Sequence, residues 1–242
     1  MHAARDVRLV IDAEQVALCG DLQTIGRHRH ASAAVVVGLD GPIRIVAERV
    51  HATRACILAP GFGHAVDVRG RLAVFLLPVH ALSGADVPPL RDVAAPPWLE
   101  LAGAVARDEL AGFDLVERLV RRSAPQHRPI DDRLRRGLSS ITDALEENLP
   151  VDVIADAAGL SPSRLMALVR AQLGTSLRGY RRWLRTFAVA RAYASGGSLT
   201  SAALDAGFAS SSHLVTAARA QFGIRPSQIL SPANRPAIRA VG

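Results

Sequence analysis

The chain has 242 residues, 49% hydrophobic and 21% charged, which suits one large or two modest globular domains and excludes a disordered or collagen-like chain. Aromatic residues make up only 4%, which favours helices packed through small residues over an aromatic-rich β-sandwich. The net charge of +7 comes from 29 arginines against 22 acids, since the sequence contains no lysine. A compositional bias of the genome and selection of the guanidinium group for anions both explain this total, so the total alone does not decide between them.

The first ninety residues contain short, β-branched apolar runs that are separated by turn residues. Glycine and proline in 38–42 and 59–63 supply two of the turns. This pattern predicts a small antiparallel β-barrel or sandwich. The expected strands are 7–11, 33–39, 43–47, 55–58 and 72–77.

Two cysteines lie in this part, Cys19 and Cys56, both in apolar surroundings and without the CxxC spacing of a metal ribbon. We expect two reduced, buried thiols. The N-terminal stretch carries charge through its apolar residues, and no run of about 18 uncharged apolar residues occurs. The sequence therefore predicts neither a signal peptide nor a membrane span, and a cytoplasmic location.

Helical periodicity begins at Pro97, and Gly112 divides the next segment into two expected helices. Such a helical pair must bury its apolar stripe, and a second copy of the chain is a natural place for it. We therefore predict a homodimer. Its interface would include Leu101, Val105, Leu110, Phe113, Leu119 and Val120.

A linker follows, because residues 121–129 hold two prolines, a serine and three arginines. The predicted division is a domain over 1–122, a linker over 123–130, a helical domain over 131–230 and a tail over 231–242. The fold class is therefore α+β, with a small antiparallel barrel followed by helices and then an all-α domain.

The charge is divided unequally between the two halves. Residues 1–130 hold 15 arginines and 14 acids, whereas 131–242 hold 14 arginines and 8 acids, so six of the seven excess charges lie in the second half. Between Asp156 and Asp205 there are seven arginines and no acid. This asymmetry indicates a polyanion-binding domain attached to a neutral one.

The second half contains an internal repeat of helix, tight glycine turn and helix. Its expected helices are 131–147, 151–158, 162–172, 177–194, 200–206 and 211–221. Gly159 and Gly174 recur as Gly207 and Gly223, at offsets of 48 and 49 residues. In each copy an alanine precedes the first glycine by four positions, so the two helices can cross closely while the glycine takes a positive φ. Two helix-turn-helix units follow from this pattern, and Ser161 before Pro162 predicts the N-cap of one second helix.

These residues resemble the AraC/XylS-type transcription regulators. The matching stretches are 154–163 (IADAAGLSPS), 204–214 (LDAGFASSSHL) and the closing 221–227 (QFGIRPS). The resemblance covers about two-fifths of the chain. It implies a double helix-turn-helix DNA-binding domain over 131–230 and a cupin-like β-barrel with dimerisation helices before it.

The sequence departs from that family inside the recognition helices. Members commonly carry an arginine where Ala167 and Thr216 stand, and an aromatic residue where Val169 and Ala218 stand. The commonest bidentate contact to guanine is therefore missing. Ser163 and Ser212 serve equally well as helix-start residues or as base contacts. The predicted DNA-binding residues are Ser163, Arg164, Met166, Ala167 and Arg170 in one helix, Arg178, Arg181, Arg182 and Arg185 in the joining helix, and Ser211, Ser212, His213, Val215 and Thr216 in the other.

His28, His30 and His64 resemble the metal-binding histidines of cupins, but the glutamate that usually follows the first pair is absent. Imidazoles at these positions suit a metal such as zinc, the edge of an effector pocket, or a purely structural role. We predict an effector pocket and assign no metal and no cofactor.

A sequence-specific transcription regulator is the function that these features favour. It would bind double-stranded DNA as a homodimer, without enzymatic activity, with a small-molecule effector and RNA polymerase as further partners. A metal-dependent cupin enzyme fused to a DNA-binding domain is the alternative, and metal content would distinguish it. A helical adaptor for an acidic protein is the third class, and it would show no preference for duplex DNA.

Overall fold

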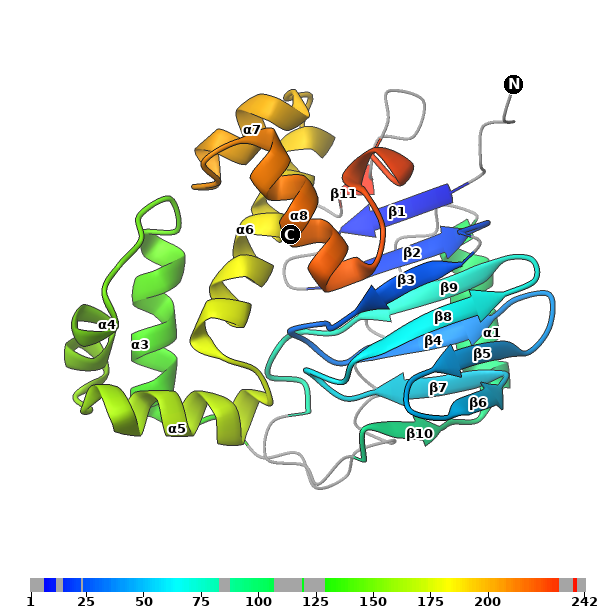
Figure 1. Ribbon diagram of the computed structural model, residues 1–242, viewed down its shortest axis with the longest axis horizontal. Helices are drawn as coiled ribbons and strands as arrows, with labels where there is room; N and C mark the ends of the chain where they lie inside the picture. The colour runs from blue at the N-terminus through cyan, green and yellow to red at the C-terminus, as the bar shows by residue number, and fades with distance from the viewer. Residues whose placement is uncertain are drawn as a thin grey trace.

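Two β-sheets packed face to face and a set of helices at one end of them make up the chain (Figure 1). The computed structural model describes residues 7–11, 15–22, 24–82, 88–106, 119, 129–230 and 237–238. The larger sheet has the order β10-β7-β4-β9-β2-β1-β11 and the smaller one β3-β8-β5-β6. Every pairing between strands is antiparallel except that of β11 with β1.

The larger sheet contains β1 (Val7–Ile11), β2 (Val16–Gly20), β4 (Ala34–Gly38), β7 (Ala55–Leu58), β9 (Leu72–Leu76), β10 (Leu90–Asp92) and β11 (Ala237–Ile238). The smaller sheet contains β3 (Ile25–His28), β5 (Ile43–Val46), β6 (Val50–Thr53) and β8 (His64–Val68). The five predicted strands are present, with bounds that shift by at most one residue at each end. The predicted small antiparallel β domain is confirmed, although its described strands form two separate sheets whose apolar inner faces pack together, and not a closed barrel.

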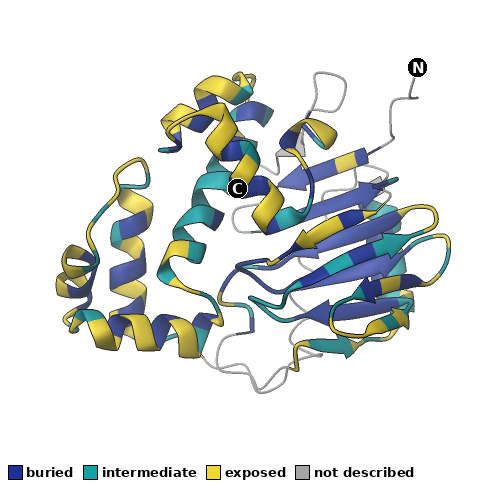
Figure 2. Ribbon diagram, viewed as in Figure 1, coloured by how far each residue is buried: buried dark blue, intermediate teal, exposed yellow. Residues whose placement is uncertain are grey.

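The central strands of the larger sheet are buried on both faces, as Figure 2 shows. In β9, Val74 belongs to the core between the sheets, whereas Phe75 belongs to a second core behind the larger sheet. Successive side chains point to opposite faces of a strand, so two covered faces require the continuous apolar run that β9 has.

The second core is closed by α1 (Ala95–Ala106), which packs on the outer face of the larger sheet. Leu101, Val105 and Leu119 are buried in this core. These three residues are therefore not available for the dimer interface that the sequence predicted, because the chain's own sheet covers them. The other members of the predicted stripe, Leu110, Phe113 and Val120, lie outside the described residues.

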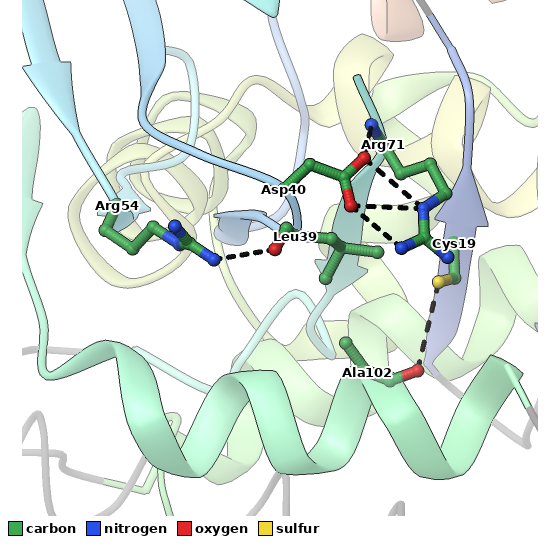
Figure 3. A network of polar contacts seen from close by, with 6 residues as sticks. All are labelled: Cys19, Leu39, Asp40, Arg54, Arg71 and Ala102. Atoms are coloured by element: carbon green, nitrogen blue, oxygen red, sulfur yellow. Dashed lines mark hydrogen bonds and ion pairs between the residues drawn. The ribbon is translucent and has the colours of Figure 1, made fainter. Parts of the chain in front are cut away.

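An ion pair fixes the turn that follows β4 (Figure 3). Arg71 donates to Asp40 from its guanidinium group and from its backbone amide, and this interaction lowers the pKa of the Asp40 carboxyl. Arg54 donates to the carbonyl of Leu39 on the same turn.

The same view shows the thiol of Cys19 near the Ala102 carbonyl of α1. Both cysteines are buried and free, as predicted, and burial raises the pKa of Cys56 to about 12.

Residues 131–228 are helical apart from the short connections between helices. They consist of α3 (Asp132–Asp143), α4 (Val151–Ala158), α5 (Pro162–Leu173), α6 (Leu177–Ala194), α7 (Leu199–Asp205), α8 (Ser211–Phe222) and a short 3-10 turn (Pro226–Gln228). Helix α3 ends four residues before the predicted boundary at residue 147. The cause is Arg185 of α6, whose guanidinium group donates to the carbonyls of Leu145, Glu146 and Glu147 and so holds that segment outside the helix.

Two backbone hydrogen bonds join the helical part to the smaller sheet. The amide of Gly26 donates to the carbonyl of Gly223 at 3.1 Å, and the amide of Arg29 donates to the carbonyl of Ala220 at 3.0 Å. The acceptors lie at the C-terminal end of α8, where helix carbonyls have no partner within the helix. Strand β3 therefore caps α8 from outside the helical domain.

Candidate nucleic-acid interface and ligand cavity

The two repeats fold as two helix-turn-helix units. Helices α4 and α5 form the first unit, and α7 and α8 form the second. The turn glycines Gly159 and Gly207 have φ angles of +64° and +79°, as the sequence predicted. Ala155 and Ala203 are completely buried where the helices of each unit cross. The small side chains thus allow the close crossing that the repeat pattern indicated.

One face of α5 is exposed and the other forms the core of the first unit. Leu165, Leu168 and Val169 are buried. The predicted contact residues on this helix, Ser163, Arg164, Met166, Ala167 and Arg170, are all exposed. Met166 is 45% exposed, which is unusual for a large apolar side chain in a folded domain. An exposed row of this kind is available to a base edge in the major groove.

Helix α8 repeats this arrangement. Its predicted contact residues Ser211, Ser212, His213 and Thr216 are exposed and Val215 is half-buried. The sequence reasoning missed Arg219, which is exposed on the same helix. The repeat could have identified this residue, because the offset of 49 residues makes Arg219 the counterpart of Arg170 in the second unit.

Serine caps define where both recognition helices begin. The hydroxyl oxygen of Ser161 accepts a hydrogen bond from the amide of Arg164, as predicted, and that of Ser210 accepts one from the amide of His213. Ser163 and Ser212 therefore lie inside the first turn and are not the caps. Their hydroxyls remain candidates for contacts with a ligand at the helix N-terminus.

The four predicted phosphate-binding arginines of α6 divide into two pairs. Arg181 donates to the Asn148 side chain at 2.6 Å and to the Leu149 carbonyl at 2.7 Å, and Arg185 donates to three carbonyls of the α3–α4 connection. These hydrogen bonds hold both side chains against the α3–α4 connection, and their assignment to phosphate contacts stays a prediction. Arg178 and Arg182 make no such bonds among the described residues. Burial, and then the neighbouring charge of Arg178, lowers the pKa of Arg182, and an anionic partner would relieve that repulsion.

A largely apolar cavity lies between the two sheets, α6 and α8. The centre of a water molecule can occupy about 90 Å³ of it. Its wall includes Val36 and Val74 of the larger sheet, Phe187 of α6 and Phe222 of α8. The polar side chains in the wall are His28, His30, His64, Thr186 and Arg225, and the others are aliphatic or aromatic. Both halves of the chain therefore build one cavity.

The three predicted pocket histidines converge in this wall. The ring nitrogens that they offer lie within 4.8 Å of one another, and all three residues are buried. Burial lowers the pKa of His28 to about 4, and it also lowers the pKa values of His30 and His64. The cluster is therefore neutral at pH 7, and its imidazole rings offer lone pairs.

Comparison with known proteins agrees with this architecture. Residues 154–231 match the family described as a helix-turn-helix domain. The arabinose operon regulatory protein of Escherichia coli is 37% identical over 79 residues, which are 30% of this chain and 27% of that protein. The chain carries a helix-turn-helix domain of the AraC type. The match spans about a quarter of the length of that relative, so it identifies this domain and not the whole protein's activity.

Outside the AraC-type domain, the likeness is one of fold. The structure of ToxT from Vibrio cholerae superposes with a TM-score of 0.61 at 10% identity, over 90% of this chain and 98% of that one. ToxT with a bound unsaturated fatty acid gives a TM-score of 0.62 at 11% identity, over 96% and 99%. The arrangement of antiparallel sheets followed by a helical domain is therefore shared along nearly the whole chain.

Proposed function

We propose that this chain is a sequence-specific transcription regulator that places α5 and α8 in successive major grooves of DNA. The observation that carries this proposal is the repeated unit, with one exposed helix face in each copy and an AraC-type domain match across both. Helix α6 joins the units. Its 18 residues span about 27 Å at about 1.5 Å per residue. The separation of the two recognition helices is this length plus the offset of each helix from the end of α6. It approaches the roughly 34 Å between successive major grooves on one side of DNA.

Phosphate contacts supply most of the binding energy in this proposal. On the recognition helices and α6, the exposed or half-buried arginines without a protein acceptor among the described residues are Arg164, Arg170, Arg178, Arg182, Arg191 and Arg219. They lie on the recognition helices and on α6, and no acid occurs between Asp156 and Asp205 to neutralise them. The recognition helices lack the usual arginines at Ala167 and Thr216, so individual base contacts are weak.

Selection of bound fragments from random or genomic DNA tests the proposal. The recovered sites should contain two conserved blocks whose centres are about 10 base pairs apart. Replacing Arg164 and Arg170 with alanine should erase one block, and replacing Thr216 and Arg219 should erase the other. Arg136→Ala is the matched control, because Arg136 is exposed on α3, outside both helix-turn-helix units. A single block, or binding without any sequence preference, would contradict two-groove recognition.

We also propose that the apolar cavity binds a small apolar effector. The cavity is shared between the sheets and the second helix-turn-helix unit, so its occupant contacts both. The fatty-acid complex of ToxT, a protein of the same fold, supports an apolar occupant. An unsaturated fatty acid is a suitable probe, and it should raise the midpoint of thermal unfolding. Ala190→Leu, which fills the cavity, should weaken this effect more than Ala188→Leu, which lies outside it.

We also propose domain boundaries and a homodimeric state for this chain. Residues 131–230 should form a folded, helical, DNA-binding fragment, which circular dichroism and DNA titration would show. A homodimer of the full chain must use a surface other than Leu101, Val105 and Leu119, which are buried. Sedimentation of the full chain and the fragment compares their association directly. The proposed role also implies a cytoplasmic location and RNA polymerase as a further partner. Among the described residues, the structure contains no helix whose length and hydropathy suit a membrane span.

A further inference from the structure

A polar cleft lies between the loop after β3, the junction of α5 with α6, and the end of α8. The centre of a water molecule can occupy about 600 Å³ of it. Three arginines line the cleft, Arg29 from the loop after β3, Arg170 from the last turn of α5 and Arg182 from α6, and no acidic residue is part of the lining. Three separate segments of the chain thus bring positive charge to one space.

The charge of these arginines is not neutralised by the described part of the chain. Arg29 and Arg170 are exposed and Arg182 is half-buried, and their guanidinium groups have no acceptor among the described residues. Burial, and then the neighbouring charge of Arg178, lowers the pKa of Arg182. The cleft therefore concentrates positive charge that an anion would neutralise.

The first turn of α6 adds backbone donors to the same cleft. Thr175, Ser176 and Gly179 belong to the lining. The hydroxyl oxygen of Ser176 accepts the amide of Gly179 at 3.1 Å, whereas helix geometry leaves the amides of Leu177 and Arg178 without a partner inside the helix. A helix N-terminus attracts anions through such amides and through its partial positive charge.

A buried glutamine gives an observation that does not depend on charge. Gln221 lines the cleft near the end of α8 and is only 2% exposed. Its Oε1 accepts the hydroxyl of Thr186 at 3.0 Å, but its Nε2 is buried and has no hydrogen-bond partner among the described residues. A buried donor without a partner is uncommon and costly in folded proteins. An acceptor in the cleft would supply the missing partner.

The C-terminal ends of α5 and α8 act in the opposite direction, because helix carbonyls carry partial negative charge there. In α8 the Ala220 and Gly223 carbonyls already accept the amides of Arg29 and Gly26. Each helix end is equivalent to roughly half an elementary charge, whereas each arginine carries a full one. The arginines therefore determine the sign of the potential, and the cleft attracts anions.

We propose that this cleft binds a phosphate group through Arg29, Arg170 and Arg182 and the first turn of α6. A phosphate monoester carries a charge of about −1.5 to −2 at pH 7, which balances three guanidinium groups better than a single carboxylate does. The planar guanidinium fork also matches two phosphate oxygens at once. One water molecule needs only about 10–15 Å³ of such space, so the cleft has room for the organic part of a phosphate ester as well.

The phosphate group can belong to a small molecule or to the DNA backbone. The second source rests on the proposed function, in which Arg170 and Arg182 contact DNA, whereas the site itself does not. Either ligand would be shared between Arg29 of the sheet part and the two arginines of the helical part. Because these three cations repel one another without an anion, binding should hold the end of α5 against the sheets.

Equilibrium dialysis of the full chain against radiolabelled inorganic phosphate tests the site, at neutral pH and at an ionic strength kept constant with sodium acetate. The expected result is one saturable phosphate per chain, with a dissociation constant at least tenfold higher in Arg29→Gln and in Arg182→Gln. Arg49→Gln and Arg191→Gln are the matched controls, since both are exposed arginines outside the lining. No saturable binding, or the same dissociation constant in all four variants, would overturn the proposal.

A charge added to the cleft tests the site without removing an arginine. Ala220 is exposed at the edge of the cleft, so Ala220→Glu should abolish phosphate binding. Ala157→Glu adds the same charge on the exposed side of α4, outside the lining, and should leave binding unchanged. Equal phosphate binding by these two variants would contradict the assignment.

Arginine side-chain NMR of the wild type avoids any dependence on folded variants. Phosphate should shift the Nε–Hε signals of Arg29, Arg170 and Arg182 and leave that of Arg191 in place. Equal shifts of all the arginine signals would indicate general ion association and would refute the site.

Dialysis of the chain saturated with a short duplex distinguishes the two sources of phosphate. Retention of the labelled phosphate assigns the site to a small phosphorylated molecule, and its displacement assigns the site to the DNA backbone. A chain that binds DNA but no phosphate would refute this site and leave the proposed function intact. A chain that binds phosphate but no DNA would refute the proposed function and leave the site intact.

Discussion

The two helix-turn-helix units have the same arrangement of helices but differ in their contacts with the β-sheets. The second recognition helix, α8, receives two backbone hydrogen bonds from β3 and supplies part of the cavity wall. The first, α5, has neither connection among the described residues and meets the sheets only near its cap, where Gly174 approaches Pro60. A change in the cavity can therefore reach α8 directly, whereas it reaches α5 through α6 or through the contact between Gly174 and Pro60. If the proposed effector binds in the cavity, we expect the α8 unit to respond to it more strongly than the α5 unit.

The largest effect should come from Gly223, the C-cap of α8. A Cβ there would lie 2.2 Å from the Gly26 carbonyl oxygen, and the φ angle of +70° adds strain. At Gly159 the φ angle is +64° and an added Cβ would have no atom within 4 Å, so Gly159→Ala introduces the backbone strain without a clash. We expect a loss of about 1–2 kcal/mol for Gly159→Ala and a further ~1–3 kcal/mol for Gly223→Ala, measured by denaturant unfolding. Equal losses would show that β3 does not hold α8.

The next effect separates the two kinds of arginine on α6. Arg185→Ala should reduce the free energy of unfolding by about 1.5–3 kcal/mol, since it removes charged hydrogen bonds to three carbonyls. Arg178→Ala should change stability by less than about 0.5 kcal/mol. It should instead weaken binding to specific and random DNA alike and reduce the slope of log K against log salt by about one. The reverse pattern would refute our division of the two pairs.

The contact faces of the units can be compared by adding an arginine to each. Ala167→Arg should shift base preference only in the block read by α5, and Thr216→Arg only in the block read by α8. A matched bidentate contact is worth about 1–3 kcal/mol. Ala157→Arg adds the same charge on the exposed side of α4 and should leave both preferences unchanged. Unchanged preference in the first two variants would mean that these positions do not face the groove.

The sequence predicted those features of the structure that depend on residues close together in the chain, and it failed for those that depend on distant contacts. The bounds of α4 and α6 were predicted to the residue, because caps such as Gly159 at the end of α4 and Ser176 at the start of α6 act within a few positions. The stripe on α1 was misassigned, because apolar residues that cover the chain's own sheet have the same spacing as those that cover a partner. The convergence of His28 and His64 could not be predicted either, since it depends on the register between β3 and β8.

The roles of the arginines also required three-dimensional contacts. Arg181 and Arg182 are adjacent in sequence and both half-buried, but only Arg181 reaches Asn148, 33 positions earlier. Spacing along α6 does not show which side chains face α3 and which face solvent. The seven arginines in the acid-free window predict a polyanion-binding surface, and both this surface and the assignment of individual residues to phosphates remain predictions.

Footprinting of DNA that is bound by the Gly26→Val variant tests the central claim most directly. The claim is that α8, and not α5, is attached to the sheets that line the cavity. Gly26 lies on β3, outside both helix-turn-helix units, and a Cβ there would press on the Gly223 carbonyl oxygen at 3.1 Å. We predict that hydroxyl-radical protection changes in the block read by α8 and is unaltered in the block read by α5. Equal changes in both blocks, or no change in either, would contradict the account.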